Sequence, residues 1–198
     1  MTRNARSHRA VNRFVPSVVK PIPEVLARET IVPGKKYDYD RLTVRTASGK
    51  TVQREMVRHP GAVVIVPILD DGRIVLIRNY RILVQKWLVE CCAGTIENGD
   101  PPAETAAREL IEETGYSTAK LTSLGYFYTT PGLTDEKMHP FVATGLTHVG
   151  QELEDDETIE VLSVAPAEAF ALIERGEMVD AKSMLALHLA RQRGHIKL

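Results

Sequence analysis

The chain has 198 residues, 43% hydrophobic and 26% charged, which is the composition of one ordinary globular domain large enough to bury a core. Its formal net charge of −1 provides no field that would attract nucleic acid or an anionic membrane. No apolar run approaches the roughly 20 residues that cross a bilayer, and no signal-peptide core follows Met1. Cys91 and Cys92 are adjacent, which fits neither a zinc site nor a disulfide framework. We therefore expect a cytoplasmic protein that binds neither nucleic acid nor membrane, with both thiols buried on a strand.

The first half of the chain is predicted to be rich in strands. Residues up to about 32 carry little periodic signal, and the basic segment 3–13 is interpreted as a disordered terminus rather than a nucleic-acid arm. Beyond it, alternating and apolar runs are bounded by turn residues, and Tyr80 and Trp87 are interpreted as core residues. The runs predict one hairpin of residues 39–46 with 51–58 and a second of residues 62–69 with 73–80. A short strand is predicted over residues 87–92.

A helix is predicted from about residue 100 to Gly115. Asp100 is a suitable N-cap, the two prolines that follow it suit a first turn, and apolar residues between 103 and 111 recur at helical spacing. The rest of the chain predicts strands over 121–129, 139–147 and 159–164, a helix over 166–175, and a last helix that Asp180 caps and that runs to about 193. This order of elements predicts an α+β protein, built as an α/β/α sandwich with a mixed sheet.

Three glutamates lie close together on the predicted helix. Glu109 and Glu113 share a face, and Glu112 is one turn from Glu109. Like charges repel at this spacing, and the C-terminal half of a helix disfavours anions, although Arg108 can pair with Glu112. Taken alone, the cluster is either an ordinary solvated acidic face or a site at which divalent cations relieve the repulsion. Mg²⁺ favours carboxylates together with substrate phosphates, which suits the second interpretation.

The context of these glutamates favours the metal site. The segment 94–116 resembles the Nudix box, in which a glycine and a loop precede a helix with Arg-Glu-aliphatic-x-Glu-Glu and a closing glycine. The residues that match at the family's spacing are Gly94, Arg108, Glu109, Leu110, Glu112, Glu113 and Gly115. Two positions depart from the pattern, since Asp100 replaces a glutamate and Tyr116 replaces an aliphatic residue.

Segments outside the box resemble the ADP-ribose pyrophosphatase branch of this family. They are residues 79–94 before the box, the post-box loop 129–136, the acidic loop and strand 154–161, and residues 176–189. The resemblance implies a Nudix domain over residues 59–198. It also implies that residues 1–58 hold an arm and a small antiparallel sheet, which packs across the two-fold axis of a homodimer.

The resemblance also implies roles for the residues of the box. The Ala93 carbonyl, Glu109 and Glu113 are expected to surround Mg²⁺, for which Mn²⁺ can substitute, and Glu112 is expected close by. The metal would polarise a phosphorus atom and help to generate hydroxide from water. Arg108 is expected to orient the glutamates rather than to touch the substrate.

The remaining candidate residues lie outside the box. In this branch the base that activates water is expected in the later acidic loop, where Glu157 is the first candidate and Asp155 the second, with Glu112 as the fallback. Arg81 is either a phosphate ligand or part of an ion pair on the strand surface. Arg54 and Glu55 either read the adenine edge or form a cross-strand salt bridge.

The sequence therefore predicts a metal-dependent enzyme that hydrolyses the diphosphate of a nucleoside-diphosphate-linked compound. The resemblance makes ADP-ribose, which gives AMP and ribose 5-phosphate, the first candidate substrate. Nucleotide sugars such as GDP-mannose or UDP-glucose are the alternatives within the same chemistry. A non-catalytic module that senses ADP-ribose is less favoured, because the box carboxylates are intact and no DNA-binding appendage is evident.

Overall fold

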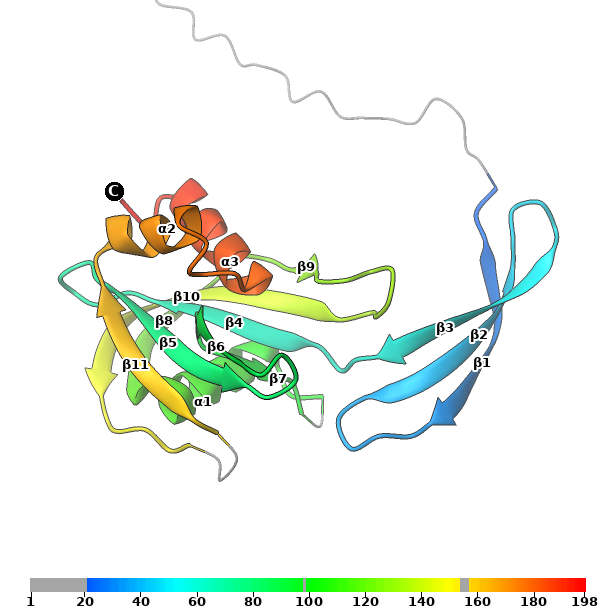
Figure 1. Cartoon of the computed structure of the whole chain (residues 1–198), viewed down its shortest axis with the longest axis horizontal. Helices are drawn as coiled ribbons and strands as arrows, with labels where there is room; N and C mark the ends of the chain where they lie inside the picture. Colours follow the sequence, from blue (N-terminus) through cyan, green and yellow to red (C-terminus); the bar gives the residue numbers. More distant parts are fainter. Residues whose placement is uncertain (1–20, 98, 154–156) are drawn as a thin grey trace, which may run out of the picture.

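The computed structural model describes residues 21–97, 99–153 and 157–198 (Figure 1). Its strands are β1 (Glu24–Val32), β2 (Asp38–Arg45), β3 (Thr51–Arg58), β4 (Ala62–Pro67), β5 (Ile74–Arg81), β6 (Lys86–Glu90), β7 (Ala93–Thr95), β8 (Tyr116–Ser123), β9 (Phe127–Tyr128), β10 (Lys137–His148) and β11 (Ile159–Val164). Its helices are α1 (Pro102–Thr114), α2 (Pro166–Glu174) and α3 (Ala181–Gln192). Among these described helices, none has both the length and the apolar character that a bilayer crossing requires. The basic segment 3–13 lies outside the described residues.

Strand β4 runs through the centre of the main domain, and all of its side chains are buried. Its alternate residues face opposite sides, as the two-residue period of a strand requires. Val64 and Val66 pack in the cluster that contains the apolar faces of α2 and α3, whereas Val63 and Ile65 pack against α1. Helix α1 therefore covers one side and α2 with α3 the other, which confirms the predicted α/β/α sandwich (Figure 1).

Two sheets make up the middle layer. One has the order β7-β4-β10-β8 with β9 beside β10, and the other has the order β11-β5-β6. The β4–β10 pair is parallel and the other pairs are antiparallel, so the layer is mixed as predicted. The predicted hairpin of 62–69 with 73–80 is wrong. Both flanks of β4 are taken by β7 and β10, and among the described residues β4 and β5 are linked through the single bridge Ile68–Ile74.

The sequence predicted three residues at helix ends, Asp100, Gly115 and Asp180, and the structure confirms the last two. Asp100 does not cap α1, because the N-cap position falls on Pro101 and has no side-chain hydrogen bond. Gly115 ends α1 in the left-handed conformation, with φ 74°, and a Cβ there would lie 2.9 Å from the backbone of Gly150. Asp180 caps α3 as predicted and accepts a 3.0 Å hydrogen bond from the Ser183 amide.

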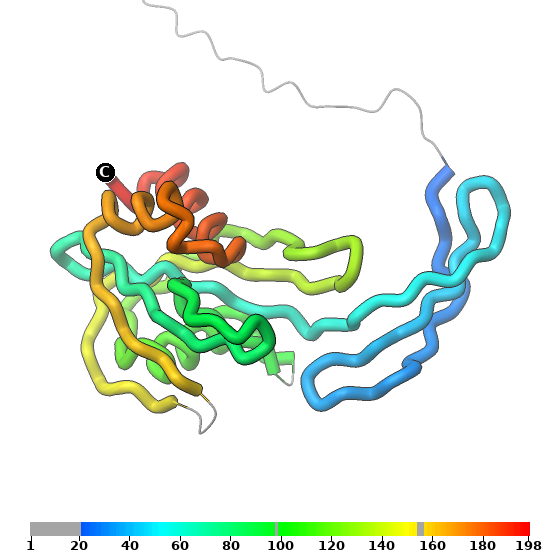
Figure 2. The backbone as a smooth tube through the Cα atoms, viewed as in Figure 1, coloured from blue at the N-terminus to red at the C-terminus, as the bar shows by residue number. Residues whose placement is uncertain are grey.

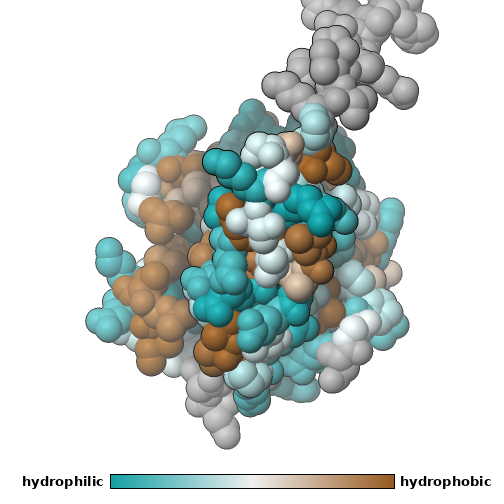
Figure 3. Space-filling view, turned by 90° about the vertical axis from the view of Figure 1, so that its right-hand side faces the viewer, coloured by the Kyte–Doolittle hydropathy of each residue, from teal (hydrophilic) through white to brown (hydrophobic). Residues whose placement is uncertain are grey.

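Strands β1, β2 and β3 form a separate antiparallel sheet beside the sandwich, and the chain passes from β3 directly into β4 (Figures 1 and 2). The β2–β3 pair is the hairpin that the sequence predicts. Strand β1 was not expected, because nearly all of its side chains are exposed and it lacks the apolar alternation of a half-buried strand. Seen from this end of the molecule, apolar and polar surface are interspersed (Figure 3).

Two expectations about individual side chains have different outcomes. Cys91 and Cys92 are free and fully buried as expected, although they lie in the link between β6 and β7 rather than on a strand. Tyr80 and Trp87 are not core residues, since they remain 41% and 40% exposed and contact each other edge to face. They pair near the tip of the β5–β6 hairpin, whose turn residues 82–84 are also exposed.

Candidate active site

Two glutamates of α1 point into the sandwich. Glu113 is 2% exposed and Glu109 is 9% exposed, because their four-residue spacing places both on the helix face that packs against β4 and β7. The Glu113 carboxylate accepts a 2.8 Å hydrogen bond from the Ala93 amide. The Glu109 carboxylate lies against Gly94, where a Cβ would come within 1.9 Å of Glu109 Cδ. The box glycine therefore allows the backbone of β7 to approach this carboxylate.

The surroundings of these two carboxylates disfavour their negative charge. Burial raises the pKa of Glu109 to about 7 and the pKa of Glu113 to about 8, from an ordinary value of 4.5. Arg108 acts to lower the first pKa and the Ala93 amide acts to lower the second, but neither offsets burial. The negative charge of Glu157 raises both further. Such a pair takes up either protons or a cation.

Arg108 holds the outer glutamate of the box. Its guanidinium donates to Glu112 at 2.6 Å and to Glu109 at 2.8 Å. Glu112 thus faces Arg108 and Glu113 faces the Ala93 amide. In the described part of the chain, no group of three or more His, Cys, Asp or Glu side chains is arranged as a metal site. The chemistry of the donors still fits a hard divalent cation, since buried carboxylates with too little positive charge beside them are such an ion's preferred ligands.

Glu157 lies on the route from the acidic loop into β11. Its charge acts on both buried glutamates, which places it within electrostatic reach of them. It also lines a pocket together with Arg81 and Asn79. Asp155, the second candidate for the base, lies outside the described residues. The structure therefore brings Glu157, predicted from the acidic loop, beside the predicted metal-binding helix.

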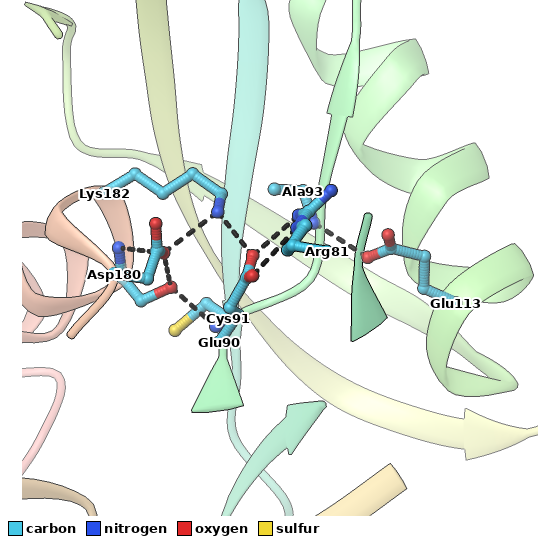
Figure 4. A network of polar contacts seen from close by, with 8 residues as sticks. Arg81, Glu90, Cys91, Ala93, Glu113, Asp180 and Lys182 are labelled. Atoms are coloured by element: carbon cyan, nitrogen blue, oxygen red, sulfur yellow. Dashed lines mark hydrogen bonds and ion pairs between the residues drawn. The ribbon is translucent and has the colours of Figure 1, made fainter. Parts of the chain in front are cut away.

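Arg81 forms an ion pair, which was one of the two alternatives for it, but its partner is a buried carboxylate that the sequence did not reveal. Its Nε and Nη2 donate to the two oxygens of Glu90 at 2.8 and 2.6 Å, and Glu90 is fully buried (Figure 4). The Nη1 atom makes no hydrogen bond with any described residue. Lys182 of α3 reaches the same carboxylate at 2.5 Å. No sequence signal identified this contact, because Glu90 and Lys182 are 92 residues apart.

Arg54 and Glu55 line a different pocket, between the N-terminal sheet and the post-box loop. Glu55 accepts hydrogen bonds from Tyr39 at 2.9 Å and from Arg41 at 3.4 Å, so it takes part in cross-strand pairing. Arg54 donates to the carbonyl of Gln53 at 2.9 Å. The cross-strand salt bridge foreseen for this dipeptide thus involves Glu55 with Arg41, and the Arg54 guanidinium borders the pocket.

The post-box loop is fixed to the end of the N-terminal sheet, which the sequence did not indicate. The Val57 amide donates to the Leu133 carbonyl at 2.9 Å, and the His59 amide donates to the Asp135 carboxylate at 2.8 Å. The His59 imidazole lies 3.5 Å from Glu136. Burial lowers the pKa of His59, although the neighbouring carboxylates oppose this shift. One wall of the Arg54 pocket is therefore held in place by backbone contacts.

Comparisons with known proteins agree with this geometry. Residues 58–187 match the NUDIX domain family. The ADP-ribose pyrophosphatase of Bacillus subtilis is 40% identical over 166 residues, which cover 83% of this chain and 90% of that protein. The GDP-mannose pyrophosphatase of Yersinia enterocolitica is 31% identical over 173 residues, or 82% of this chain and 89% of that protein. A crystal structure of an ADP compounds hydrolase superposes with a TM-score of 0.76 at 28% identity, covering 91% of this chain and all of the other.

Proposed function

The chain belongs to the NUDIX domain family, and from this premise we propose that it hydrolyses ADP-ribose to AMP and ribose 5-phosphate. The buried Glu109–Glu113 pair carries the proposal, because the donors suit a divalent cation and lie on the helix of the Nudix box beside Arg108 and Glu112. The two pyrophosphatases compared above, which share most of this chain, are named for the nucleoside-diphosphate-linked compounds ADP-ribose and GDP-mannose. The pyrophosphatase named for ADP-ribose is the more similar of the two.

We propose that Glu109, Glu113 and the Ala93 carbonyl hold Mg²⁺, with Mn²⁺ as a substitute. When bound, the metal polarises the attacked phosphorus and lowers the pKa of a water molecule. Glu112 would lie at the rim of this site, where it faces Arg108. Arg108 keeps the carboxylates oriented through its two hydrogen bonds.

The remaining roles follow from the pocket beside the metal site. Glu157 accepts a proton from the attacking water, because it lies within electrostatic reach of both metal-binding glutamates. Asp155, in the preceding loop, is the second candidate. Arg81 pairs with a substrate phosphate through the edge of its guanidinium that Glu90 does not occupy. Arg54 and Glu55 hold the adenine in the pocket against the post-box loop.

Nucleotide-sugar hydrolysis is the alternative, and the similarity to a GDP-mannose pyrophosphatase favours it over other diphosphates. Hydrolysis of a nucleotide sugar would require different nucleobase and sugar pockets from hydrolysis of ADP-ribose, but the same metal chemistry. A non-catalytic sensor of ADP-ribose is less supported, because all three box glutamates are present with their arginine.

We also propose a cytoplasmic homodimer formed through the N-terminal region 1–58, with the small sheet β1-β2-β3 at the interface. A small sheet is stable in water when it has a hydrophobic face to bury, and Val25 and Leu26 of β1 are left exposed in the single chain. Two free cysteines without a disulfide suit a reducing compartment.

A substrate panel tests the proposal. The purified protein is incubated with ADP-ribose, GDP-mannose and UDP-glucose, each with Mg²⁺, with Mn²⁺ and with excess chelator, and the products are identified. Hydrolysis of ADP-ribose to AMP at the highest kcat/KM, abolished by chelator and restored by metal, is the expected result. Preference for a nucleotide sugar would select the alternative, and full turnover in chelator would remove the metal site.

A further inference from the structure

A chain of alternating charges connects the start of α3 to the candidate active site. Glu90 lies between Lys182 on one side and Arg81 on the other (Figure 4). The Lys182 ammonium is 2.5 Å from Glu90 Oε2 and 2.9 Å from Asp180 Oδ2. The first turn of α3 is fixed independently, because the Cys91 amide donates to Ser183 Oγ at 2.8 Å. The ammonium is therefore held on the Glu90 carboxylate by the fold of both elements.

Of the two cations that contact Glu90, Arg81 is the more accessible to a ligand. The side chain of Glu90 is 1% exposed and that of Lys182 is 16% exposed, whereas Arg81 is 38% exposed and lines the pocket that contains Glu157. A buried carboxylate must be compensated by neighbouring cations. With Arg81 as its sole partner, Glu90 would neutralise the guanidinium. With Lys182 sharing the charge of Glu90, Arg81 retains attraction for a phosphate in the pocket.

We propose that Lys182 is a positioning residue for phosphate binding, acting through the Glu90 carboxylate that it shares with Arg81. The proposal rests on the proposed function and deepens it, because it adds α3 to the elements that bind the substrate diphosphate. Lys182 partly neutralises Glu90, which fixes the guanidinium by its Nε and Nη2 edge and leaves Nη1 for the substrate. Without the Lys182 ammonium, the carboxylates of Asp180 and Glu90 lose the cation that they share. Arg81 is then drawn more strongly onto Glu90.

The test compares Lys182→Met, Lys182→Arg and Arg175→Met in hydrolysis of ADP-ribose with saturating Mg²⁺. Arg175 is the matched control, because it is also a cation shared by two carboxylates, Glu168 and Glu177, and it lies at the end of α2. For Lys182→Met we expect KM to rise about tenfold, the effect of one charge-assisted hydrogen bond, and kcat to change less. The Kd of the methylene-bridged analogue of ADP-ribose should rise in parallel. Lys182→Arg should recover most of the affinity, and Arg175→Met should leave both constants unchanged.

A double-mutant cycle separates this role from simple support of the fold. In a Glu90→Gln background there is no carboxylate to share, so Lys182→Met should no longer raise KM or Kd. An equal effect in both backgrounds would overturn the proposal, as would wild-type KM and Kd in Lys182→Met. If Lys182→Met unfolds, Lys182→Gln with the same cycle gives the answer. Absence of ADP-ribose hydrolysis by the wild-type chain would instead contradict the proposed function, while analogue binding still tests Lys182.

Discussion

The Glu109 carboxylate occupies the space that a side chain at residue 94 would need, since a Cβ on Gly94 would lie 1.9 Å from Glu109 Cδ. Gly94→Ala must therefore push Glu109 away from β7. We expect turnover to fall on the order of 10²-fold, comparable to the loss of one key electrostatic group. The overpacking should also lower the free energy of unfolding by about 1–3 kcal/mol. Gly132→Ala is the control for stability, because a Cβ there meets nothing within 4 Å and should leave the melting temperature unchanged.

Glu113→Gln should remove catalysis without unfolding the protein. The amide keeps the shape of the side chain and removes a charge that a cation would otherwise compensate. We expect kcat to fall on the order of 10²-fold or more. In metal-free buffer near neutral pH the variant should be as stable as the wild type or more so, because folding of the wild type then costs either the uptake of a proton by Glu113 or the burial of its charge, and Gln costs neither. A variant that unfolds, or one that turns over at the wild-type rate, contradicts this assignment.

The metal-free protein should lose stability as the pH rises. Glu109 and Glu113 have folded-state pKa values of about 7 and about 8, above their ordinary 4.5, so the folded state holds their protons more tightly than the unfolded state does. Their stabilising contribution is present below about pH 4.5 and is lost as the pH rises towards about 8. Because metal competes with these protons, the increase in melting temperature caused by Mg²⁺ should grow over the same range.

Thermal unfolding in chelator and in Mg²⁺, measured from about pH 5 to about pH 9, checks this dependence. Glu113→Gln isolates the contribution of the site from other titrating groups, since it should flatten the fall in stability. A wild-type melting temperature in chelator that rises over this range relative to Glu113→Gln would refute the pKa assignments.

Glu157→Gln should lower the maximal rate and leave metal binding nearly intact, because Glu157 is not a ligand in the box. We expect kcat to fall by about 10²-fold, the contribution of a general base. Steady-state rates at saturating metal measure this loss. Asp155→Asn is the paired variant. If Asp155→Asn alone is impaired, the two residues exchange roles, and if neither loses about tenfold, Glu112 becomes the candidate base.

Val25→Glu should weaken the proposed dimer. The wild-type Val25 side chain, on strand β1 of the small sheet, is 56% exposed in the single chain, so a charge there should cost the fold of one subunit little. Burial of that charge at an apolar interface would be unfavourable. Sedimentation at micromolar concentration should show a dimer for the wild type and a larger monomer fraction for the variant. A wild-type chain that sediments only as a 22.0 kDa species would contradict the dimer itself.

The parts of the fold that sequence reasoning predicted are those that local periodicity encodes. The apolar run of β4, the spacing of α1 and the cap at Asp180 all have local physical causes, and the structure contains each of them. Strand β1 escaped prediction because an exposed strand has no apolar alternation. The β4–β5 hairpin was wrong because a central strand pairs with distant partners, which local turn residues do not reveal.

The same distinction applies to the candidate site. The box residues lie within one helix and its preceding strand, so their spacing made them visible. Glu90 and Lys182 could not be paired from the sequence, because their contact depends on the docking of α3 against the end of β6. The sequence identified Arg81 as a suitable phosphate ligand, but it did not identify Glu90 as the partner of its guanidinium. The contact between Val57 and Leu133 joins two backbones and therefore leaves no trace in residue identity.

Because the contact between Val57 and Leu133 joins two backbones, the position of the post-box loop does not depend on the side chain at residue 133. The Val57 amide holds the Leu133 carbonyl at 2.9 Å whatever side chain residue 133 carries. Substitutions in the loop can therefore change what the Arg54 pocket recognises while its wall stays in place. If the nucleobase binds in this pocket as proposed, exchanging side chains along residues 130–134 would change the lining that it meets without moving the wall.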